Sequence, residues 1–317
     1  MKHILFALIA LSILFIGIAG NNPAFVLGQD SSATDESWEP NRLADGQPDI
    51  QGIYINPWVF TIENYTDQER EEFQQAMIEH RGPETGAYDF DWLEQSTTER
   101  RADYPYPDNF YGVSKPPSGR IPWQDWAFQK KKYLSHHPYE KREFFDSRIR
   151  CLPAGTPRGF FWSFYNGWQI LQPPGHVVIL YEHNHLYRVI PLDDSPHLGK
   201  DINLWMGDSR GRWEGNTLVV DVTNLTDKTW VIGELGGEGI HIGSFHSEDI
   251  HVVERFTIVD KDNIDYEVTI EDPNVFTEPW SMKYRVFTRA PKDYVLFEYA
   301  CHEGNRTMEL TFGDTRD

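Results

Sequence analysis

The chain has 317 residues, of which 14% are aromatic and 39% hydrophobic, and a formal net charge of −20 at pH 7. A chain this acidic lacks the basic surface that binds nucleic acid or an anionic membrane, so we expect neither as a partner. The aromatic and aliphatic content is sufficient for a sizeable core, which excludes a disordered protein.

The first 28 residues predict an export signal. Lys2 and His3 precede an apolar run over residues 4–19, which is shorter than the roughly 20 residues that a membrane-spanning helix needs. Cleavage after Gly28 or after Ala19 fits a signal peptidase, and an uncleaved N-terminal anchor is the alternative. No later segment is long and apolar enough to span a bilayer. We therefore expect a periplasmic or extracellular (secreted) protein that is not inserted in a membrane after signal cleavage.

Residues 29–125 predict an N-terminal region with a strand, a helix and an irregular arm. After a polar lead-in, residues 49–56 are typical of a strand. A capping box that begins at Thr66 predicts a helix over residues 66–80. Residues 81–125 contain several prolines and little periodicity, which indicates a surface arm or lid.

Residues 126–317 predict a β-barrel domain, because from His176 onward short alternating runs are separated by turn residues. We expect hairpins from these paired runs, followed by a last strand at 307–312: 177–182 with 186–192, 204–213 with 217–223, 250–259 with 264–271, and 283–288 with 294–301. Such an antiparallel meander tends to close on itself, since closure removes the exposed edges. The predicted fold is therefore mainly β, a meander that closes into a lipocalin-like barrel, with a sandwich as the alternative.

The chain has two cysteines, Cys151 and Cys301. In an oxidising compartment they predict a disulfide, which would stabilise the fold by roughly 5 kcal/mol on the chain-entropy model. Two separate buried thiols are the alternative.

Several blocks of the chain resemble a widespread family of uncharacterised secreted bacterial proteins. The resemblance covers about residues 150–305 and rests on these segments: RCLPAGTPR (150–158), WMGDSRGRWEGNTLVV (205–220), NLTDKTW (224–230), HSEDIHVVERFT (246–257), TIEDPNVFTEPW (269–280) and EYACHEGN (298–305). It implies a secreted, β-rich protein and carries no activity, substrate or cofactor with it.

The most unusual polar segment is 208–214. On a strand, Asp208, Arg210 and Arg212 share one face, while Ser209 and Trp213 share the other. In a barrel interior the two guanidinium groups could clamp a carboxylate or a sugar hydroxyl, and Trp213 is a further candidate ligand-binding residue. The alternative is structural ion pairing across strands.

A second cluster consists of His246, His251, Glu254 and Arg255. Strand alternation places His251 and Arg255 on one face and Glu254 on the face of the apolar residues Ile250, Val252, Phe256 and Ile258. A carboxyl group buried there would suit a general acid or base, although it could equally pair with an arginine of the next strand. His246 precedes the strand, where it could reach a barrel mouth.

A third cluster contains Glu298 and His302, which share a face if the predicted strand runs through His302. They form a possible general base or two ligands of a metal. Cys301 is a weak candidate nucleophile, because adjacent strand residues point to opposite faces. His183 and His185 could form a metal-binding pair, but they lie at a hairpin turn. We predict neither a metal nor a cofactor.

These observations predict a secreted or periplasmic β-barrel protein that binds a small organic ligand in its interior. The alternative is an extracytoplasmic, cofactor-independent lyase, isomerase or hydrolase, with a histidine–carboxylate pair in the same cavity and an arginine as anion clamp. Its candidate residues are His246, His302, Glu254 and Asp208 for proton transfer and Arg210 or Arg212 for the clamp. A structural or protein-interaction module is a third possibility. The chain contains no G-x-S-x-G elbow and no P-loop.

Overall fold

The computed structural model describes residues 38–55, 68, 111–137, 140–160, 167–232, 243–306 and 309. All of them belong to one unit that spans residues 34–317. The predicted signal sequence lies outside the described residues, as do the predicted helix at 66–80 apart from Gln68 and the predicted strand at 307–312 apart from Glu309.

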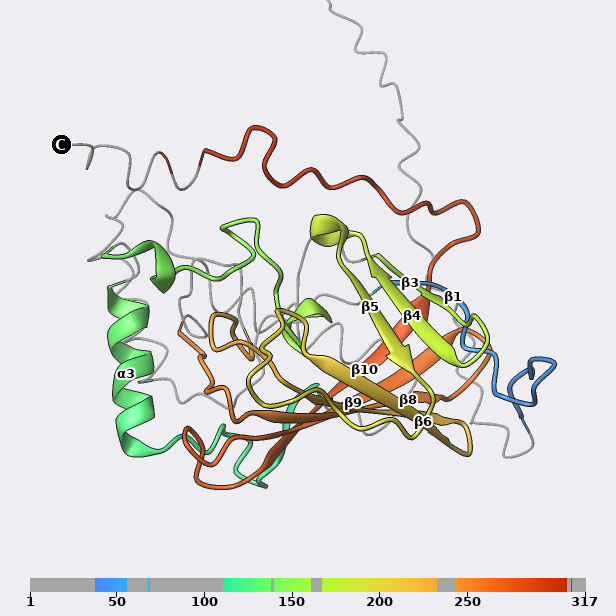
Figure 1. The fold of residues 1–317 in the computed structure, drawn as a ribbon, viewed down its shortest axis with the longest axis horizontal. Helices are drawn as coiled ribbons and strands as arrows, with labels where there is room; N and C mark the ends of the chain where they lie inside the picture. The colour runs from blue at the N-terminus through green and yellow to red at the C-terminus, as the bar shows by residue number, and fades with distance from the viewer. Residues whose placement is uncertain are drawn as a thin grey trace, which may run out of the picture. The chain divides into compact units, whose positions relative to one another are not determined.

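The described chain forms one antiparallel sheet (Figure 1). Along the sheet the strands follow the order β5-β4-β3-β1-β10-β9-β8-β7-β6, and β2 pairs with β10 off this path. The strands are β1 (Gly52–Ile55), β2 (Tyr111–Lys115), β3 (Trp168–Leu171), β4 (His176–Tyr181), β5 (Tyr187–Pro191), β6 (Asp208–Glu214), β7 (Thr217–Thr223), β8 (His251–Ile258), β9 (Asn263–Glu271) and β10 (Trp280–Arg289). Sequential antiparallel pairing of β4 with β5, β6 with β7 and β8 with β9 confirms three of the predicted hairpins.

The two ends of this strand order, β5 and β6, lie against each other without forming a hydrogen-bonded ladder. Arg188 of β5 donates a hydrogen bond to Ser209 of β6 at 3.0 Å. Gly211 of β6 packs so closely on β5 that an added Cβ would lie 2.8 Å from Ile190 Cγ2. The sheet is therefore nearly closed into a barrel, which confirms the predicted fold class: mainly β, with an antiparallel meander.

The interior of the barrel contains a packed aromatic core. Alternate residues of β8 and β9 are buried, as strand periodicity requires. Phe160, from the short 3₁₀ helix η3 (Arg158–Phe160), lies with its ring centroid 5.0–5.7 Å from those of Trp168, Tyr181, Phe256, Tyr266 and Phe287. Burial of each large apolar side chain contributes roughly 1.5–3 kcal/mol, so this cluster is a main source of stability.

The helix α3 (Asp125–His136) lies beside the sheet (Figure 1). Ala127 and Leu134 are both buried. They are seven residues apart, which is two helical turns, so they lie on the same face of the helix. Leu134 packs on Gly243, and Lys130 Nζ lies 4.0 Å from the ring centre of Phe245. Sequence periodicity did not predict this helix, nor the short strands β2 and β3. Among the described residues no helix combines the length and apolarity that crossing a membrane requires.

The predicted strand at 294–301 is wrong, since these residues form no strand in the structure. They follow β10 as an irregular segment in which alternate hydrophobic residues are exposed, including Val295 and Phe297. The segment is attached by side chains instead of a hydrogen-bond ladder, because Glu182 accepts hydrogen bonds from the Tyr294 hydroxyl and the Phe297 amide. Glu298 and His302 therefore do not share a strand face, which corrects that prediction.

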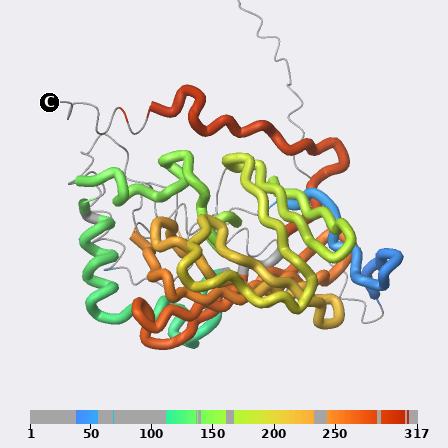
Figure 2. Tube along the Cα trace, in the orientation of Figure 1, coloured from blue at the N-terminus to red at the C-terminus, as the bar shows by residue number. Residues whose placement is uncertain are grey.

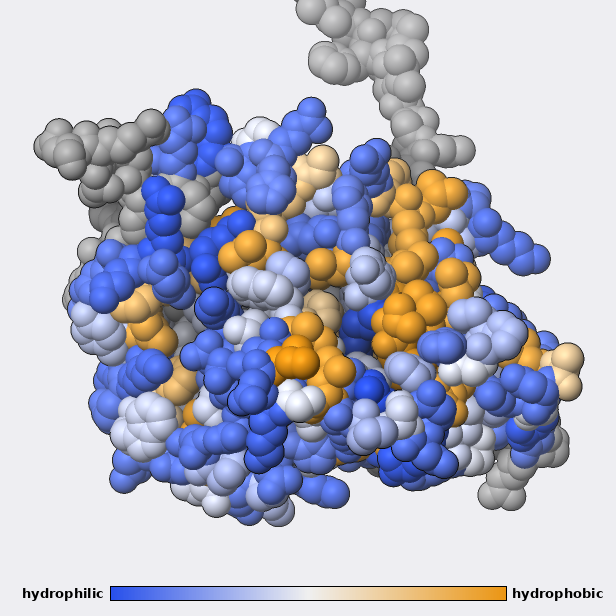
Figure 3. Space-filling model, viewed as in Figure 1, coloured by the Kyte–Doolittle hydropathy of each residue, from blue (hydrophilic) through white to orange (hydrophobic). Residues whose placement is uncertain are grey.

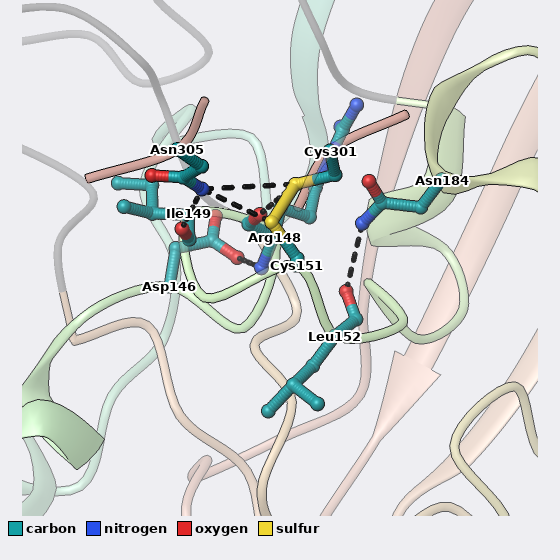
Figure 4. The surroundings of a disulfide bond; sticks show 8 residues. All are labelled: Asp146, Arg148, Ile149, Cys151, Leu152, Asn184, Cys301 and Asn305. Atoms are coloured by element: carbon teal, nitrogen blue, oxygen red, sulfur yellow. Dashed lines mark hydrogen bonds between the residues drawn. A yellow bond between two sulfur atoms is a disulfide. The ribbon is translucent and has the colours of Figure 1, made fainter. Parts of the chain in front are cut away.

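The predicted disulfide is confirmed. Cys151 and Cys301 are bonded, and their Cα atoms lie 5.5 Å apart (Figure 4). The bond closes a loop with a sequence separation of 150 residues, which attaches the segment after β10 to the turn that precedes η3.

The outer surface of the barrel is not uniform. Hydrophobic residues gather over β4 and β5, where Val189 is 48% exposed (Figure 3). The outer face of β6, β7 and β8 carries charged and imidazole side chains instead, namely those of Asp208, Asp221 and His251. The two faces therefore present different chemistry to the solvent.

Candidate functional site

A group of histidine and aspartate side chains occupies the outer face of the barrel. We define the outer His–Asp cluster as His197, Asp208, Asp221 and His251. Asp221 of β7 lies opposite Arg210 of β6 in the sheet register, and alternation turns it away from the buried Val220 and Val222. Three neighbouring strands supply Asp208, Asp221 and His251, while the loop after β5 supplies His197.

Asp221 is bound by two imidazole rings. His197 Nε2 lies 2.7 Å from Asp221 Oδ1, and His251 Nε2 lies 2.8 Å from Asp221 Oδ2. The other ring nitrogen of His197, Nδ1, lies 3.0 Å from Asp208 Oδ2. Ionised carboxylates only accept hydrogen bonds, so His197 satisfies both contacts when both of its nitrogens carry protons. His197 thus lies between two carboxylates and bridges Asp208 and Asp221.

The imidazole of His251 has a different arrangement. Its Nε2 faces Asp221, and its Nδ1 lies 3.8 Å from Glu271 Oε2, which is too long for a hydrogen bond. The side chain is 37% exposed. When Nε2 carries the proton that Asp221 accepts, Nδ1 keeps its lone pair. This combination is the geometry of a general base that a carboxylate orients.

The electrostatics favour ionised carboxylates in this cluster. Burial opposes ionisation of Asp221, but hydrogen bonds from His251 and His197 outweigh it and lower the pKa of its carboxyl group. Burial likewise opposes ionisation of Asp208, while hydrogen bonds from the Leu198 amide, Arg210 and His197 lower its pKa overall. Both aspartates are therefore placed to accept hydrogen bonds from the imidazole rings as carboxylates.

Arg210 fastens the loop that carries His197. Its Nε and Nη2 donate to the Ser195 and Pro196 carbonyls at 3.1 and 2.9 Å, and Nη1 donates to Asp208 Oδ1 at 2.7 Å. Asn224 holds the same loop, since its Nδ2 donates to the Gly199 carbonyl at 2.9 Å. The guanidinium group is thus used in positioning the loop, which differs from the predicted ligand clamp in a barrel interior.

A second polar group lies inside the barrel. Glu254 is fully buried and forms an ion pair with Arg188 at 2.6 Å, and it accepts a hydrogen bond from the Tyr266 hydroxyl at 2.8 Å. Burial, followed by the charge of Glu254, raises the pKa of Tyr266 well above its usual value. The prediction that Glu254 shares the apolar face of β8 is confirmed. Its arginine partner comes from β5, across the barrel, and not from an adjacent strand.

The other predicted site residues lie elsewhere. Arg212 and Arg255 both bind Glu214 on the exposed face, at 2.8 and 3.0 Å, so the ion-pairing alternative describes them. Trp213 Nε1 donates to Gln47 Oε1 at 3.1 Å. Glu298 and His302 are exposed on the segment that follows β10. The three sequence clusters therefore do not meet in a single cavity.

His246 is buried and tied to neighbouring loops. Its Nε2 lies 2.8 Å from Thr229 Oγ1, and its Nδ1 lies 2.8 Å from the Ser247 carbonyl oxygen. Burial lowers the pKa of its imidazole. Both nitrogens are thus engaged in holding the loop before β8, away from the predicted barrel mouth.

Sequence reasoning identified Asp208 and His251 of the outer His–Asp cluster and missed the other two members. Asp221 is the one charged residue in the strand TLVVDVT, a signal that an alternation analysis could have used. His197 lies in an irregular loop, where no periodicity marks it. Within the residues that the structure describes, no group of three or more His, Cys, Asp or Glu side chains is arranged to hold a metal ion.

No family model matches the chain, and no similar protein was found among curated proteins or solved structures.

Proposed function

We propose that this protein is an extracytoplasmic enzyme of the hydrolase, lyase or isomerase class in which His251 transfers protons at the outer His–Asp cluster. The observation that carries the proposal is the asymmetry of its imidazole. Nε2 is held by Asp221 at 2.8 Å, whereas Nδ1 makes no hydrogen bond among the described residues.

The roles of the residues follow from their contacts. Asp221 orients His251 and stabilises the imidazolium that forms when Nδ1 accepts a proton from a substrate. His197 holds Asp221 from the other side, and Asp208 holds His197, so both are positioning residues. General acid–base catalysis by one such group contributes on the order of 10²- to 10⁴-fold in rate.

Three observations support an extracytoplasmic location. Residues 1–28 have the pattern of an export signal, and the blocks at 150–305 resemble secreted bacterial proteins. The Cys151–Cys301 disulfide is typical of oxidising compartments.

A second candidate function is storage or transport of a small organic ligand inside the barrel. The nearly closed sheet favours it, as does a polar group, Arg188 with Glu254, enclosed by aromatic side chains. Both carboxylate oxygens of Glu254 already accept hydrogen bonds from Arg188 and Tyr266, although Arg188 Nε has no partner among the described residues. Because a ligand would have to compete with those bonds, the outer cluster is the stronger candidate.

The test compares two histidine variants of the full chain. His251→Gln keeps an amide donor that can reach Asp221 but removes the basic nitrogen, and His302→Gln changes an exposed histidine outside the cluster. Purified proteins are assayed against chromogenic esters, glycosides and phosphate esters. We expect turnover by wild type and His302→Gln, and a loss on the order of 10²-fold or more in His251→Gln without a change in melting temperature. Full turnover by His251→Gln would contradict the proposal.

A second measurement does not depend on the substrate. Nitrogen–proton NMR correlation of the imidazole rings identifies which nitrogen carries the proton. At neutral pH we expect His251 to be protonated at Nε2, as its contact with Asp221 requires. A neutral ring protonated only at Nδ1 would contradict its role as a base at that atom.

A further inference from the structure

The segment after β10 crosses the end of the β4–β5 hairpin as an extended chain (Figures 1 and 2). We define residues 291–306 as the C-terminal strap. Its side chains contribute little burial, since Val295 is 64% and Phe297 61% exposed. Because the hydrophobic effect scales with the apolar area removed from water, packing alone holds the strap weakly.

The first attachment of the strap is a set of hydrogen bonds to the side chain of Glu182. Glu182, at the end of β4, is 2% exposed. Its carboxylate accepts hydrogen bonds from the Tyr294 hydroxyl at 2.6 Å, the Phe297 amide at 3.1 Å and the Gly167 amide at 2.9 Å. Two of these donors belong to the strap, so the buried carboxylate holds residues 294–297 without any covalent bond.

The second attachment is covalent. Cys301 is bonded to Cys151, and beyond it Asn305 Nδ2 donates to the Ile149 carbonyl oxygen at 3.2 Å (Figure 4). Cys151 and Cys301 are half-buried, and the neighbouring His302 and Glu303 are exposed. The disulfide is therefore the strongest constraint on residues 298–306.

Between the two attachments the strap covers a buried basic group. The ring of Tyr299 stacks on that of His183, with centroids 4.6 Å apart and planes at 25°. His183 is 5% exposed, and Arg148 and Arg158 are 2% and 0% exposed. Burial, then the charges of Arg148 and Arg158, lowers the pKa of His183 to about 2. Tyr299 of the strap thus covers the imidazole of His183.

We propose that residues 298–306 are a thiol-sensitive cover over His183, which the Cys151–Cys301 disulfide keeps closed. A dithiol reductant supplies two electrons and two protons, becomes a disulfide itself and leaves both cysteines as thiols. Tyr299 then separates from His183, while residues 294–297 remain on Glu182. The proposal is independent of the enzymatic role of His251.

The test measures how fast diethyl pyrocarbonate modifies His183 in the folded protein, with and without dithiothreitol. We expect a rise of about tenfold or more on reduction, and the same rise in the oxidised Tyr299→Ala variant and in the Cys151→Ser/Cys301→Ser double variant. Hydrogen exchange should increase over 298–306 and stay unchanged over 294–297. The buried His246, which lies outside the strap, is the internal control.

Two results would overturn the proposal. If His183 stays unreactive after complete reduction, the disulfide does not keep the cover closed. If His246 and the strands β8 and β9 lose protection together with His183, reduction unfolds the domain and no local cover exists. The Tyr299→Ala variant separates these cases, because it removes the stacked ring while the disulfide stays intact.

Discussion

Arg188 of β5 binds Glu254 of β8 across the interior of the barrel, with Nη2 2.6 Å from Oε2 and Nη1 3.2 Å from Oε1. The two strands are not neighbours in the sheet. The same guanidinium group donates to Ser209 of β6. Arg188 therefore joins the two unpaired edges of the sheet from the inside, where a backbone ladder is missing.

Removal of one partner of this ion pair should be strongly destabilising. In Glu254→Leu the guanidinium of Arg188 stays buried without its carboxylate, so we expect a loss of about 3–5 kcal/mol of unfolding free energy. In the double variant Arg188→Met/Glu254→Leu both charges are gone, and we expect much of that loss to be recovered. Urea unfolding of the single and double variants measures the coupling.

Arg255→Ala is the matched control, since Arg255 lies on the same strand and makes an exposed ion pair with Glu214. It should have little effect on stability. Additive losses in the Arg188/Glu254 cycle would show that the two side chains do not act as a pair.

Replacing Gly207 by a residue with a side chain should destabilise the fold, because Gly207 immediately precedes β6. Its φ is +73°, and an added Cβ would lie 2.6 Å from Val222 Cγ1 and 2.9 Å from the Thr223 carbonyl oxygen. Gly207→Ala therefore combines left-handed strain with a clash, and we expect a cost of about 1–3 kcal/mol and displacement of Asp208. Gly215→Ala is the control, because Gly215 has φ +62° and open space around it. Equal losses in the two variants would contradict the clash.

Buried histidines should make the protein less stable in mild acid. Burial lowers the pKa of His246 and of His183 below the usual value. In the unfolded chain these histidines bind protons near pH 6.5, whereas in the folded chain they stay neutral to lower pH. Their contribution to the unfolding free energy is therefore complete above about pH 6.5 and declines as pH falls. Denaturant unfolding at successive pH values between 7 and 5 measures the decline. His183→Asn should reduce the slope, and an unchanged slope would exclude His183 as its source.

A separate loss of stability is expected in stronger acid. The carboxyl groups of Asp208 and Asp221 have lowered pKa values. So does that of Asp146, where burial opposes ionisation but the Arg158 charge and the Arg148 amide outweigh it. A carboxyl group whose pKa is lower in the folded protein stabilises the fold at pH values above its unfolded pKa of about 3.9. This stabilisation disappears as the pH falls through the pKa of the folded protein. Asp221→Asn should flatten the stability curve below about pH 4, and an equally steep curve would contradict this origin.

Local patterns explain the part of the fold that could be predicted. Gly215 and Asn216 of the predicted turn lie between β6 and β7, and Thr217–Thr223 is a strand with the predicted bounds. Alternation also placed Glu254 correctly among apolar neighbours. These features depend on the alternation of side chains along a strand and on the residues of the turn. Both patterns lie within about ten residues and can be read from the sequence.

The same local rule failed where no partner strand was present. Residues 294–301 alternate in hydrophobicity, yet they form no strand and leave Val295 and Phe297 exposed. A strand is stable only when an edge accepts its hydrogen bonds, and alternation alone does not supply that edge. The short strand β3 shows the converse, because its four residues pair with β4 and three of them also pair with β1.

By itself, the amino-acid sequence determined the acidic, aromatic-rich composition, three of the hairpins, the inward position of Glu254 and the presence of two cysteines able to bond. The tertiary structure alone decided that Asp221 meets His197 and His251, and that Arg188 meets Glu254. The reason is physical: periodicity is a local property, whereas strand order, register and closure bring together residues that are far apart in the chain.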